Sequence, residues 1–266
     1  MNTIAKLIEK KVAGEKLTCL TAYDASFAAL LNDAGIEIIL VGDSLGMVVQ
    51  GKETTLPVTL DEIIYHASAV KRGAPDAFIV VDLPFMTYST PVQALKNAGK
   101  VMKRSGANMV KLEGGDTMLE TVSLLTSHGV PVCAHVGLLP QSVHKIGGYR
   151  VQGKTNKEAT RILEDAVALE VAGADLIVLE CVPAGLAKEI SLQLTIPTIG
   201  IGAGVDCDGQ VLVLYDMLNI TKGKRPRFSK DFLSAQGAGQ SSILNAVKSY
   251  IDAVKTGAFP GQEHSF

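Results

Sequence analysis

The sequence predicts a (β/α)8 barrel, in which eight parallel strands alternate with helices. Short apolar, β-branched runs alternate with longer segments of helical period along all 266 residues. There are about eight such pairs, which is the number and spacing that a closed barrel needs. A doubly wound open sheet is the alternative, but no Gly-rich GxGxxG turn follows the first strand to favour it.

The expected strands are short apolar runs of the kind buried in parallel sheets. They are Leu17–Asp24, Ile36–Asp43, Ala77–Pro84, Ala107–Gly114, Val130–Gly137, Asp175–Val182, Ile196–Gly204 and Gln210–Asp216. The expected helices between them mostly begin near Ser or Thr and end near Gly, as helix termini prefer. They include Ser26–Gly35, Thr59–Ala74, Thr90–Gly106, Thr117–Gly129 and Lys157–Ala174.

The whole chain, 1–266, is expected to form one barrel domain, because no Pro/Ser-rich linker divides it. A short N-terminal helix precedes the barrel, and an extra helix with a polar tail follows from Arg225 onward. One segment departs from the alternation. Gln141–Lys157 is a long, Gly-containing insertion after the fifth strand, and long loops of this kind are often functional lids.

Composition excludes several classes of partner. The 25 Lys and Arg nearly balance the 27 Asp and Glu, and no strongly basic run suggests a nucleic acid or an anionic membrane surface. No segment approaches the roughly 18 to 20 apolar residues of a membrane-spanning helix, and the N-terminus lacks the pattern of a signal peptide. Four scattered cysteines without a CxxC motif predict reduced thiols in a cytoplasmic protein.

Polar residues end most of the expected strands, and in a barrel these ends meet at one mouth. The residues are Asp24, Asp43, Ser44, Asp82, Lys111, Glu113, His135, Glu180 and Asp216. Crowded carboxylates repel one another unless a cation lies among them. Asp43, Asp82 and Glu113 suit Mg²⁺, whereas zinc is disfavoured because HExxH and paired Cys/His spacings are missing. The alternative is that these acids only cap helices and form salt bridges.

Three residues at these strand ends carry further hypotheses. Lys111 is two residues from Glu113 on a strand, so both face the mouth, where Lys111 could pair with an acid, clamp an anionic substrate or form a Schiff base. The nearby carboxylates favour a protonated clamp. His135 is either a satisfied core residue or a hydrogen-bond donor to a substrate oxygen. Glu180 ends the apolar run "LIVLE", where desolvation would raise its proton affinity, as a general base for a weak carbon acid requires.

The run "GIGAG", Gly200 to Gly204, also has two interpretations. Glycines after the seventh strand of a barrel can cradle a phosphate group. They can equally allow close packing of the chain.

Several long blocks resemble the ketopantoate hydroxymethyltransferase family. They include "LVGDSLGMVVQG", "TLPVTLDEIIYHASAV", "GANMVKLEGG", "PVCAHVGLLPQSV" and the tail "FPGQEHSF", and the resemblance runs from about Leu17 to Phe266. Departures fall only at loop positions such as Lys145 and Ile146, and in the segment before Leu17. None of these departures touches a residue with an expected chemical role.

The resemblance implies a barrel of the phosphoenolpyruvate/pyruvate-domain type, dependence on Mg²⁺ and a place in pantothenate biosynthesis. The implied reaction transfers a hydroxymethyl group from 5,10-methylenetetrahydrofolate to 3-methyl-2-oxobutanoate. The implied metal ligands are Asp43, Asp82 and Glu113, and the base is Glu180. Substrate contacts are expected from Asp43, Ser44, Asp82, Lys111 and His135. The resemblance also implies a homodecamer of two five-membered rings.

Two rival functions remain open at this stage. One is another Mg²⁺-dependent barrel enzyme acting on oxo acids, such as an aldolase or a lyase, which needs no folate. The other is a non-catalytic anion-binding or scaffold protein, which has no need for a base beside a metal cluster.

Overall fold

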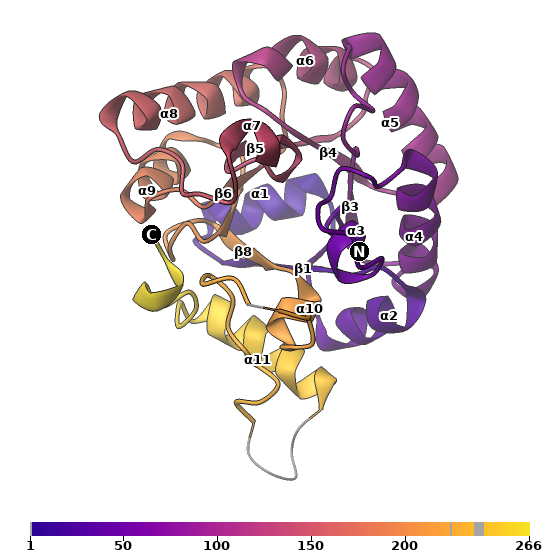
Figure 1. The fold of residues 1–266 in the computed structure, drawn as a ribbon, viewed down its shortest axis with the longest axis vertical. Helices are drawn as coiled ribbons and strands as arrows, with labels where there is room; N and C mark the ends of the chain where they lie inside the picture. The colour runs from indigo at the N-terminus through magenta and orange to yellow at the C-terminus, as the bar shows by residue number, and fades with distance from the viewer. Residues whose placement is uncertain (1, 224, 237–241) are drawn as a thin grey trace.

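The computed structural model describes residues 2–223, 225–236 and 242–266. Eight parallel strands form a closed barrel in chain order, and the last strand pairs with the first (Figure 1). The strands are β1 Leu17–Thr21, β2 Ile38–Val41, β3 Phe78–Asp82, β4 Met109–Glu113, β5 Val132–Gly137, β6 Leu176–Glu180, β7 Thr198–Ile201 and β8 Gly209–Leu212. The predicted barrel is therefore confirmed, and the open sheet is excluded.

Helices surround the barrel and cover its outer face (Figure 1). They are α2 Ala25–Ala34, α4 Leu60–Gly73, α5 Pro91–Ser105, α6 Leu119–Ser127, α8 Asn156–Val171, α9 Ala184–Gln193 and α11 Ile243–Lys255. The predicted caps are present: Thr59 begins α4 with a full capping box to Glu62, and Thr90 begins α5 with a proline in the first turn.

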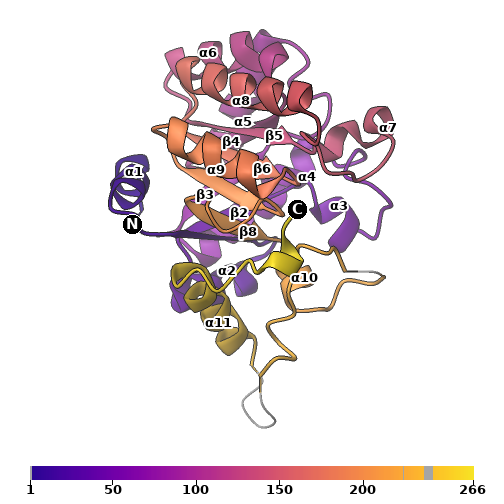
Figure 2. The ribbon, with the colours of Figure 1, turned by 90° about the vertical axis from the view of Figure 1, so that its left-hand side faces the viewer.

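Shorter elements lie at the two ends of the barrel. Helix α1, Ile4–Val12, lies at one end, whereas α3 Leu45–Val48, α7 Val143–Ile146 and α10 Leu214–Met217 lie at the other (Figure 2). The 3-10 helices are η1 Asp116–Met118, η2 Pro140–Ser142 and η3 Gln262–His264. Because α3, α7 and α10 follow strands β2, β5 and β8, their end of the barrel is the mouth formed by the strands' carboxyl ends.

The barrel interior is built by the two-residue alternation of the strands. On β3, Phe78 and Val80 belong to the apolar cluster inside the barrel, whereas Ile79 and Val81 belong to the cluster between the strands and the helices. The same alternation places Met109 of β4 and Val178 of β6 inside the barrel. On β3, β4, β5 and β6 the inward stripe ends at the mouth on a polar side chain.

Two predicted boundaries are wrong. The eighth strand ends at Leu212, and Asp216 lies in the following helix α10 rather than at a strand end. The insertion predicted at Gln141–Lys157 contains the rest of η2 and all of α7, and its last two residues already belong to α8, which starts at Asn156. Thr155 caps α8 through a capping box with Glu158, and this local signal ends the loop earlier than periodicity predicts.

The remaining sequence expectations concern thiols and membranes. All four cysteines are free and buried, as predicted for reduced core residues. Among the described residues, no helix combines the length and the apolar character that crossing a bilayer requires.

Candidate active site

Strand alternation brings five of the predicted residues into the mouth. Asp82, Lys111, Glu113, His135 and Glu180 each extend the inward stripe of β3, β4, β5 or β6. The register places Asp82 opposite Lys111 and Glu113 opposite His135. The side chains therefore meet because of strand pairing, although they come from distant parts of the sequence.

Asp43, Asp82 and Lys111 form a buried charged group. The Lys111 Nζ lies 2.8 Å from Asp82 Oδ1, and the Asp43 backbone N–H donates to Asp82 Oδ2 at 3.0 Å. Burial alone would lower the pKa of Lys111, but the charges of Asp82, Glu113 and Asp43 outweigh it and raise that pKa above its ordinary value. Lys111 is therefore a permanent cation in this environment.

The carboxyl group of Asp43 is strongly perturbed. Burial, followed by the charge of Asp82, raises the pKa of Asp43 to about 7. Next to it, Ser44 immediately precedes α3, and its hydroxyl group lies 2.8 Å from the hydroxyl of Tyr23. Asp43 is thus not a simple cap of the short helix that follows it, because its side chain lies within the buried polar cluster.

His135 lies between two carboxylates. Its Nδ1 is 3.7 Å from Glu113 Oε1, and its Nε2 is 3.3 Å from Glu180 Oε2. Burial, followed by the charge of Lys111, holds the pKa of His135 well below its usual range, so the ring is neutral and these contacts are not ion pairs. Neither buried ring nitrogen has a hydrogen-bond partner of good geometry. Such orphaned groups are rare, and a substrate oxygen or a water could satisfy them.

Glu180 ends β6 with its side chain only 14% exposed. Burial raises the pKa of Glu180 to about 8, and the opposing charge of Lys111 only partly offsets this effect. The carboxylate therefore binds a proton much more tightly than an exposed glutamate does. This is the perturbation predicted for a general base acting on a weak carbon acid.

Two of the predicted mouth acids have other roles. The Asp24 carboxylate accepts a hydrogen bond from the backbone N–H of Phe27 at 2.9 Å and caps α2. Asp216 is buried within α10. The cap interpretation is therefore correct for Asp24, whereas Asp43, Asp82, Glu113 and Glu180 belong to the buried cluster.

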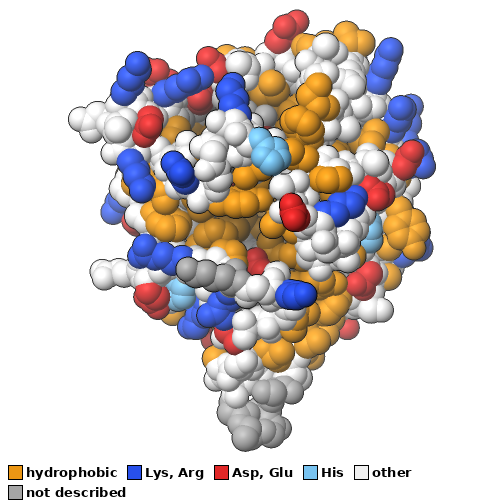
Figure 3. Space-filling model, viewed as in Figure 1, with side chains coloured by type: hydrophobic (Ala, Val, Ile, Leu, Met, Phe, Trp, Pro, Cys, Tyr) orange, Lys and Arg blue, Asp and Glu red, His pale blue; other side chains and the backbone are white. Residues whose placement is uncertain are grey.

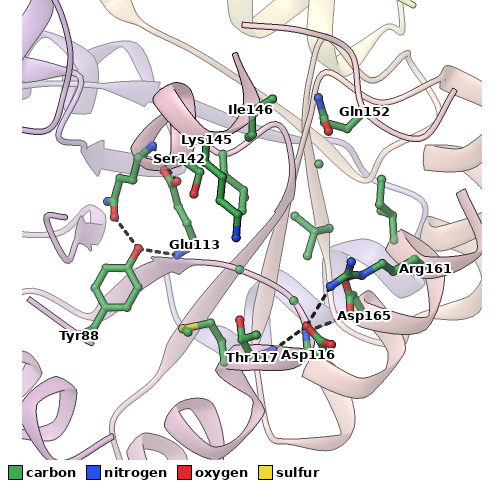
Figure 4. Close-up of a pocket in the computed structure, with 18 of the residues that line it drawn as sticks. Tyr88, Glu113, Asp116, Thr117, Ser142, Lys145, Ile146, Gln152, Arg161 and Asp165 are labelled. Carbon is green, nitrogen blue, oxygen red and sulfur yellow. Dashed lines mark hydrogen bonds and ion pairs between the residues drawn. The ribbon is translucent and has the colours of Figure 1, made fainter. Parts of the chain in front are cut away.

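Sequence reasoning missed Gln141 and Tyr88. The Gln141 side chain donates to Asp43 Oδ2 at 2.9 Å, and its backbone N–H donates to Glu113 Oε2 at 3.0 Å. The Tyr88 hydroxyl donates to Gln141 Oε1 and accepts from the Glu113 backbone N–H at 3.4 Å (Figure 4). Both residues follow strands, but a loop glutamine or tyrosine carries no charge or motif that would distinguish it in the sequence.

A cavity of about 510 Å³ opens beside this cluster. Glu113, Tyr88 and Lys145 line one side, and Asp116, Arg161 and Asp165 lie on the opposite side (Figure 4). The face of the molecule at the mouth is hollowed near its centre, and hydrophobic side chains surround the hollow (Figure 3). The cavity is thus large enough for a ligand and contacts the buried cluster through Glu113.

The glycines of the "GIGAG" run are closely packed. A Cβ atom at Gly200 would lie 2.8 Å from Cys207 Sγ, and one at Gly204 would lie 2.6 Å from the Ala184 Cβ. Both distances are shorter than normal contacts, so close packing explains these glycines without a bound phosphate.

The donor set fits a hard divalent cation. The charges of three carboxylates, Asp43, Asp82 and Glu113, act on the single ammonium group of Lys111, so an added cation would offset their repulsion. In the part of the chain that the structure describes, no group of three or more His, Cys, Asp or Glu side chains could hold a metal by itself. Mg²⁺ does not need such a cage, because it commonly uses one or two carboxylates and completes its shell with waters and substrate.

Comparison with known proteins identifies the family. A protein-family model described as ketopantoate hydroxymethyltransferase matches residues 1–262 of the chain. The chain is 60% identical over 264 residues to 3-methyl-2-oxobutanoate hydroxymethyltransferase of Paraburkholderia phymatum, covering 99% of this chain and 96% of that protein. It is 61% identical over 254 residues to the enzyme of the same name from Nitrosospira multiformis, covering 95% of each. The chain belongs to the ketopantoate hydroxymethyltransferase family.

As a member of the ketopantoate hydroxymethyltransferase family, the protein is a transferase enzyme. Its fold resembles phosphonopyruvate hydrolase, solved in complex with oxalate and Mg²⁺, at a TM-score of 0.61 and 13% identity, covering 96% and 99% of the two chains. It also resembles 2,3-dimethylmalate lyase, described as a member of the PEP mutase/isocitrate lyase superfamily. The TM-score is 0.58 and the identity is 15%, and the match covers 98% of this chain and 100% of that chain. These likenesses agree with the eight-stranded barrel as the fold of the chain.

Proposed function

We propose that this enzyme transfers a hydroxymethyl group from 5,10-methylenetetrahydrofolate to 3-methyl-2-oxobutanoate, giving ketopantoate and tetrahydrofolate in pantothenate biosynthesis. The relatives named for this activity support the choice of oxo acid. The observation that carries the chemistry is the buried Glu180 carboxylate in the same mouth as Asp82 and Lys111. A strong base beside a cationic, metal-compatible cluster suits removal of a proton next to a carbonyl group.

The proposed metal residues are Asp43, Asp82 and Glu113. Mg²⁺ held there would polarise the 2-oxo group of the substrate and make its neighbouring C3–H more acidic. The Asp43 backbone N–H donates to Asp82, and the Gln141 backbone N–H donates to Glu113. The three carboxylates would hold the ion together.

The other residues have distinct proposed roles. Lys111 is a protonated clamp for the substrate's negative oxygens, and Ser44 and His135 bind the oxo acid, as Asp43 and Asp82 also do. Glu180 takes the C3 proton. The C3 carbon then forms a bond to the methylene carbon of the folate in its iminium form. Water cleaves the bond between that carbon and the folate nitrogen, giving its oxygen to the new hydroxyl group and a proton to the nitrogen, which releases ketopantoate and tetrahydrofolate. The raised pKa of Glu180 supports this assignment, because it increases the driving force for proton removal.

The assembly and the compartment are also proposals. The family resemblance supports a homodecamer of two five-membered rings. The four free, buried cysteines support a reducing compartment, and we propose the cytoplasm.

A turnover assay tests the proposed function. The protein is incubated with 3-methyl-2-oxobutanoate and Mg²⁺, with and without 5,10-methylenetetrahydrofolate, and ketopantoate is measured by mass spectrometry. We expect product only when the folate is present. Cleavage or condensation of the oxo acid without folate would favour the aldolase or lyase alternative, and no conversion under any condition would contradict an enzymatic role in this reaction.

A further inference from the structure

Gln141 uses every hydrogen-bonding group of its amide in the buried cluster. Its Nε2 donates to Asp43 Oδ2 at 2.9 Å and to the Leu83 carbonyl oxygen at 3.0 Å, and its Oε1 accepts from the Tyr88 hydroxyl. The residue is 6% exposed. An amide with two donated bonds and one accepted bond has a single consistent orientation, so Asp43 faces a fixed donor.

The backbone of Gln141 contacts a second carboxylate. Its N–H donates to Glu113 Oε2 at 3.0 Å, so one residue holds Asp43 at the end of β2 and Glu113 at the end of β4. Tyr88 strengthens this link, because its hydroxyl group contacts both Gln141 Oε1 and the Glu113 backbone N–H. A continuous hydrogen-bonded path therefore joins Asp43, Gln141, Tyr88 and Glu113.

The position of Gln141 in the chain adds a second feature. It lies in η2, at the start of the β5–α8 loop, which we define as residues 138–155. The other end of this loop is attached beside the proposed base, because the Gln152 backbone N–H donates to the Cys181 carbonyl oxygen at 2.9 Å. The loop that borders the 510 Å³ cavity is thus attached at one end to two carboxylates and at the other to the residue after Glu180.

We propose that Gln141 is a positioning residue for the metal site, acting through Asp43 and Glu113. The inference rests on the proposed function, because it concerns the direction in which two proposed metal-site carboxylates are held. Hydrogen-bond partners behind metal ligands fix ligand orientation, and their loss typically weakens metal affinity or activity about 10- to 100-fold. Tyr88 acts one step further away, by fixing the orientation of the Gln141 amide.

Mn²⁺ binding without turnover tests this proposal. Free Mn²⁺ is titrated against the protein and measured by electron paramagnetic resonance for the unaltered enzyme, Gln141→Met, Tyr88→Phe and the double variant. Methionine matches glutamine in length but cannot donate to Asp43. We expect Gln141→Met to weaken Mn²⁺ affinity about 10- to 100-fold, and Tyr88→Phe to weaken it less. Because Gln141→Met already removes the acceptor of the Tyr88 hydroxyl and leaves only its 3.4 Å contact with the Glu113 N–H, the double variant should bind Mn²⁺ only slightly more weakly than Gln141→Met.

Gln50→Met is the matched control, because the Gln50 amide also donates to a carboxylate, that of Glu62 at 3.0 Å, outside the cluster. It should bind Mn²⁺ as the unaltered enzyme does. Unchanged Mn²⁺ affinity in Gln141→Met, or equal weakening in Gln50→Met, would overturn the positioning role. If Gln141→Met does not fold, Tyr88→Phe decides alone, and normal Mn²⁺ affinity in it overturns the role. Failure of the unaltered enzyme to bind Mn²⁺ would instead overturn the metal proposal, and the positioning role with it.

Discussion

Glu180 shows how the end of an apolar strand creates a strong base. Alternation on β6 places Leu176 and Val178 inside the barrel, and the next inward position is the carboxylate. The same packing that excludes water from the stripe also desolvates Glu180 and raises its pKa to about 8. The sequence predicted this perturbation because an apolar run leading into a carboxylate is visible without knowledge of the fold.

The pH dependence of catalysis should report this residue. Glu180 must be ionised to accept a proton, so kcat/KM is expected to fall about tenfold per pH unit below the pKa of Glu180 and to level off above it. At low Mg²⁺ concentration the inflection of the kcat/KM profile should lie at about pH 8. At higher Mg²⁺ concentration it should move to lower pH, because the positive charge of the bound ion favours the ionised carboxylate and lowers the pKa of Glu180. Steady-state rates between pH 6 and 9 provide the measurement. A flat profile over this range would argue against Glu180 as the base.

At the scale of elements, helix α11 closes the seam between the first and last strands. The Tyr250 hydroxyl lies 3.0 Å from the Cys19 carbonyl oxygen on β1 and 2.8 Å from the Gln210 carbonyl oxygen on β8. Tyr250 is fully buried. A helix added after the barrel thus ties together the two strands whose pairing closes it.

Removing the Tyr250 hydroxyl group should lower the free energy of unfolding of the barrel. Tyr250→Phe keeps the ring but leaves buried carbonyl oxygens without this donor, which is expected to cost about 1 to 3 kcal/mol of unfolding free energy. The matched control is Tyr65→Phe, since Tyr65 is 69% exposed, and it should change stability little. Chemical denaturation of both variants gives the comparison. Equal stability of the two would show that the Tyr250 hydrogen bonds do not stabilise the seam.

Sequence patterns predicted the strands better than they predicted where each element ends or begins. The apolar runs predicted all eight strands, because buried parallel strands have a distinctive composition. The end of β8 was wrong because "VLVLYD" continues an apolar pattern into α10, where a strand and a buried helix look alike. Periodicity predicts a start of α8 one residue too late, because the Thr155 cap, and not the apolar pattern, sets where the helix begins.

At the scale of the whole molecule, barrel closure brings residues from five strand ends, and from the loops after β3 and β5, into a single cluster. The sequence predicted its members Asp43, Asp82, Lys111, Glu113, His135 and Glu180, since each lies near the carboxyl end of an expected strand. It could not predict their pairing, because the contact of Lys111 with Asp82 depends on the register between β3 and β4. Gln141 was missed for a related reason: its partners are more than 25 residues away in sequence.

Metal binding should stabilise the folded molecule as a whole. A cation that binds only the folded state adds about 2.7 kcal/mol when its concentration is 100 times its Kd. Mg²⁺ is therefore expected to raise the melting temperature, and chelation should lower it again. Asp82→Asn should abolish most of this shift, because it removes a carboxylate next to Asp43. An equal Mg²⁺-dependent shift in Asp82→Asn would place the ion elsewhere.

The most direct test of the account follows the C3 proton of 3-methyl-2-oxobutanoate in deuterium oxide with Mg²⁺ and no folate. If Glu180 removes this proton before the one-carbon donor reacts, proton NMR should show loss of the C3 signal and collapse of the methyl doublet. Glu180→Gln keeps the shape of the side chain but cannot accept the proton, so exchange should fall about 10²- to 10⁴-fold while the substrate still binds. Exchange at the unaltered rate in Glu180→Gln would contradict the account and make His135 the next candidate for the base.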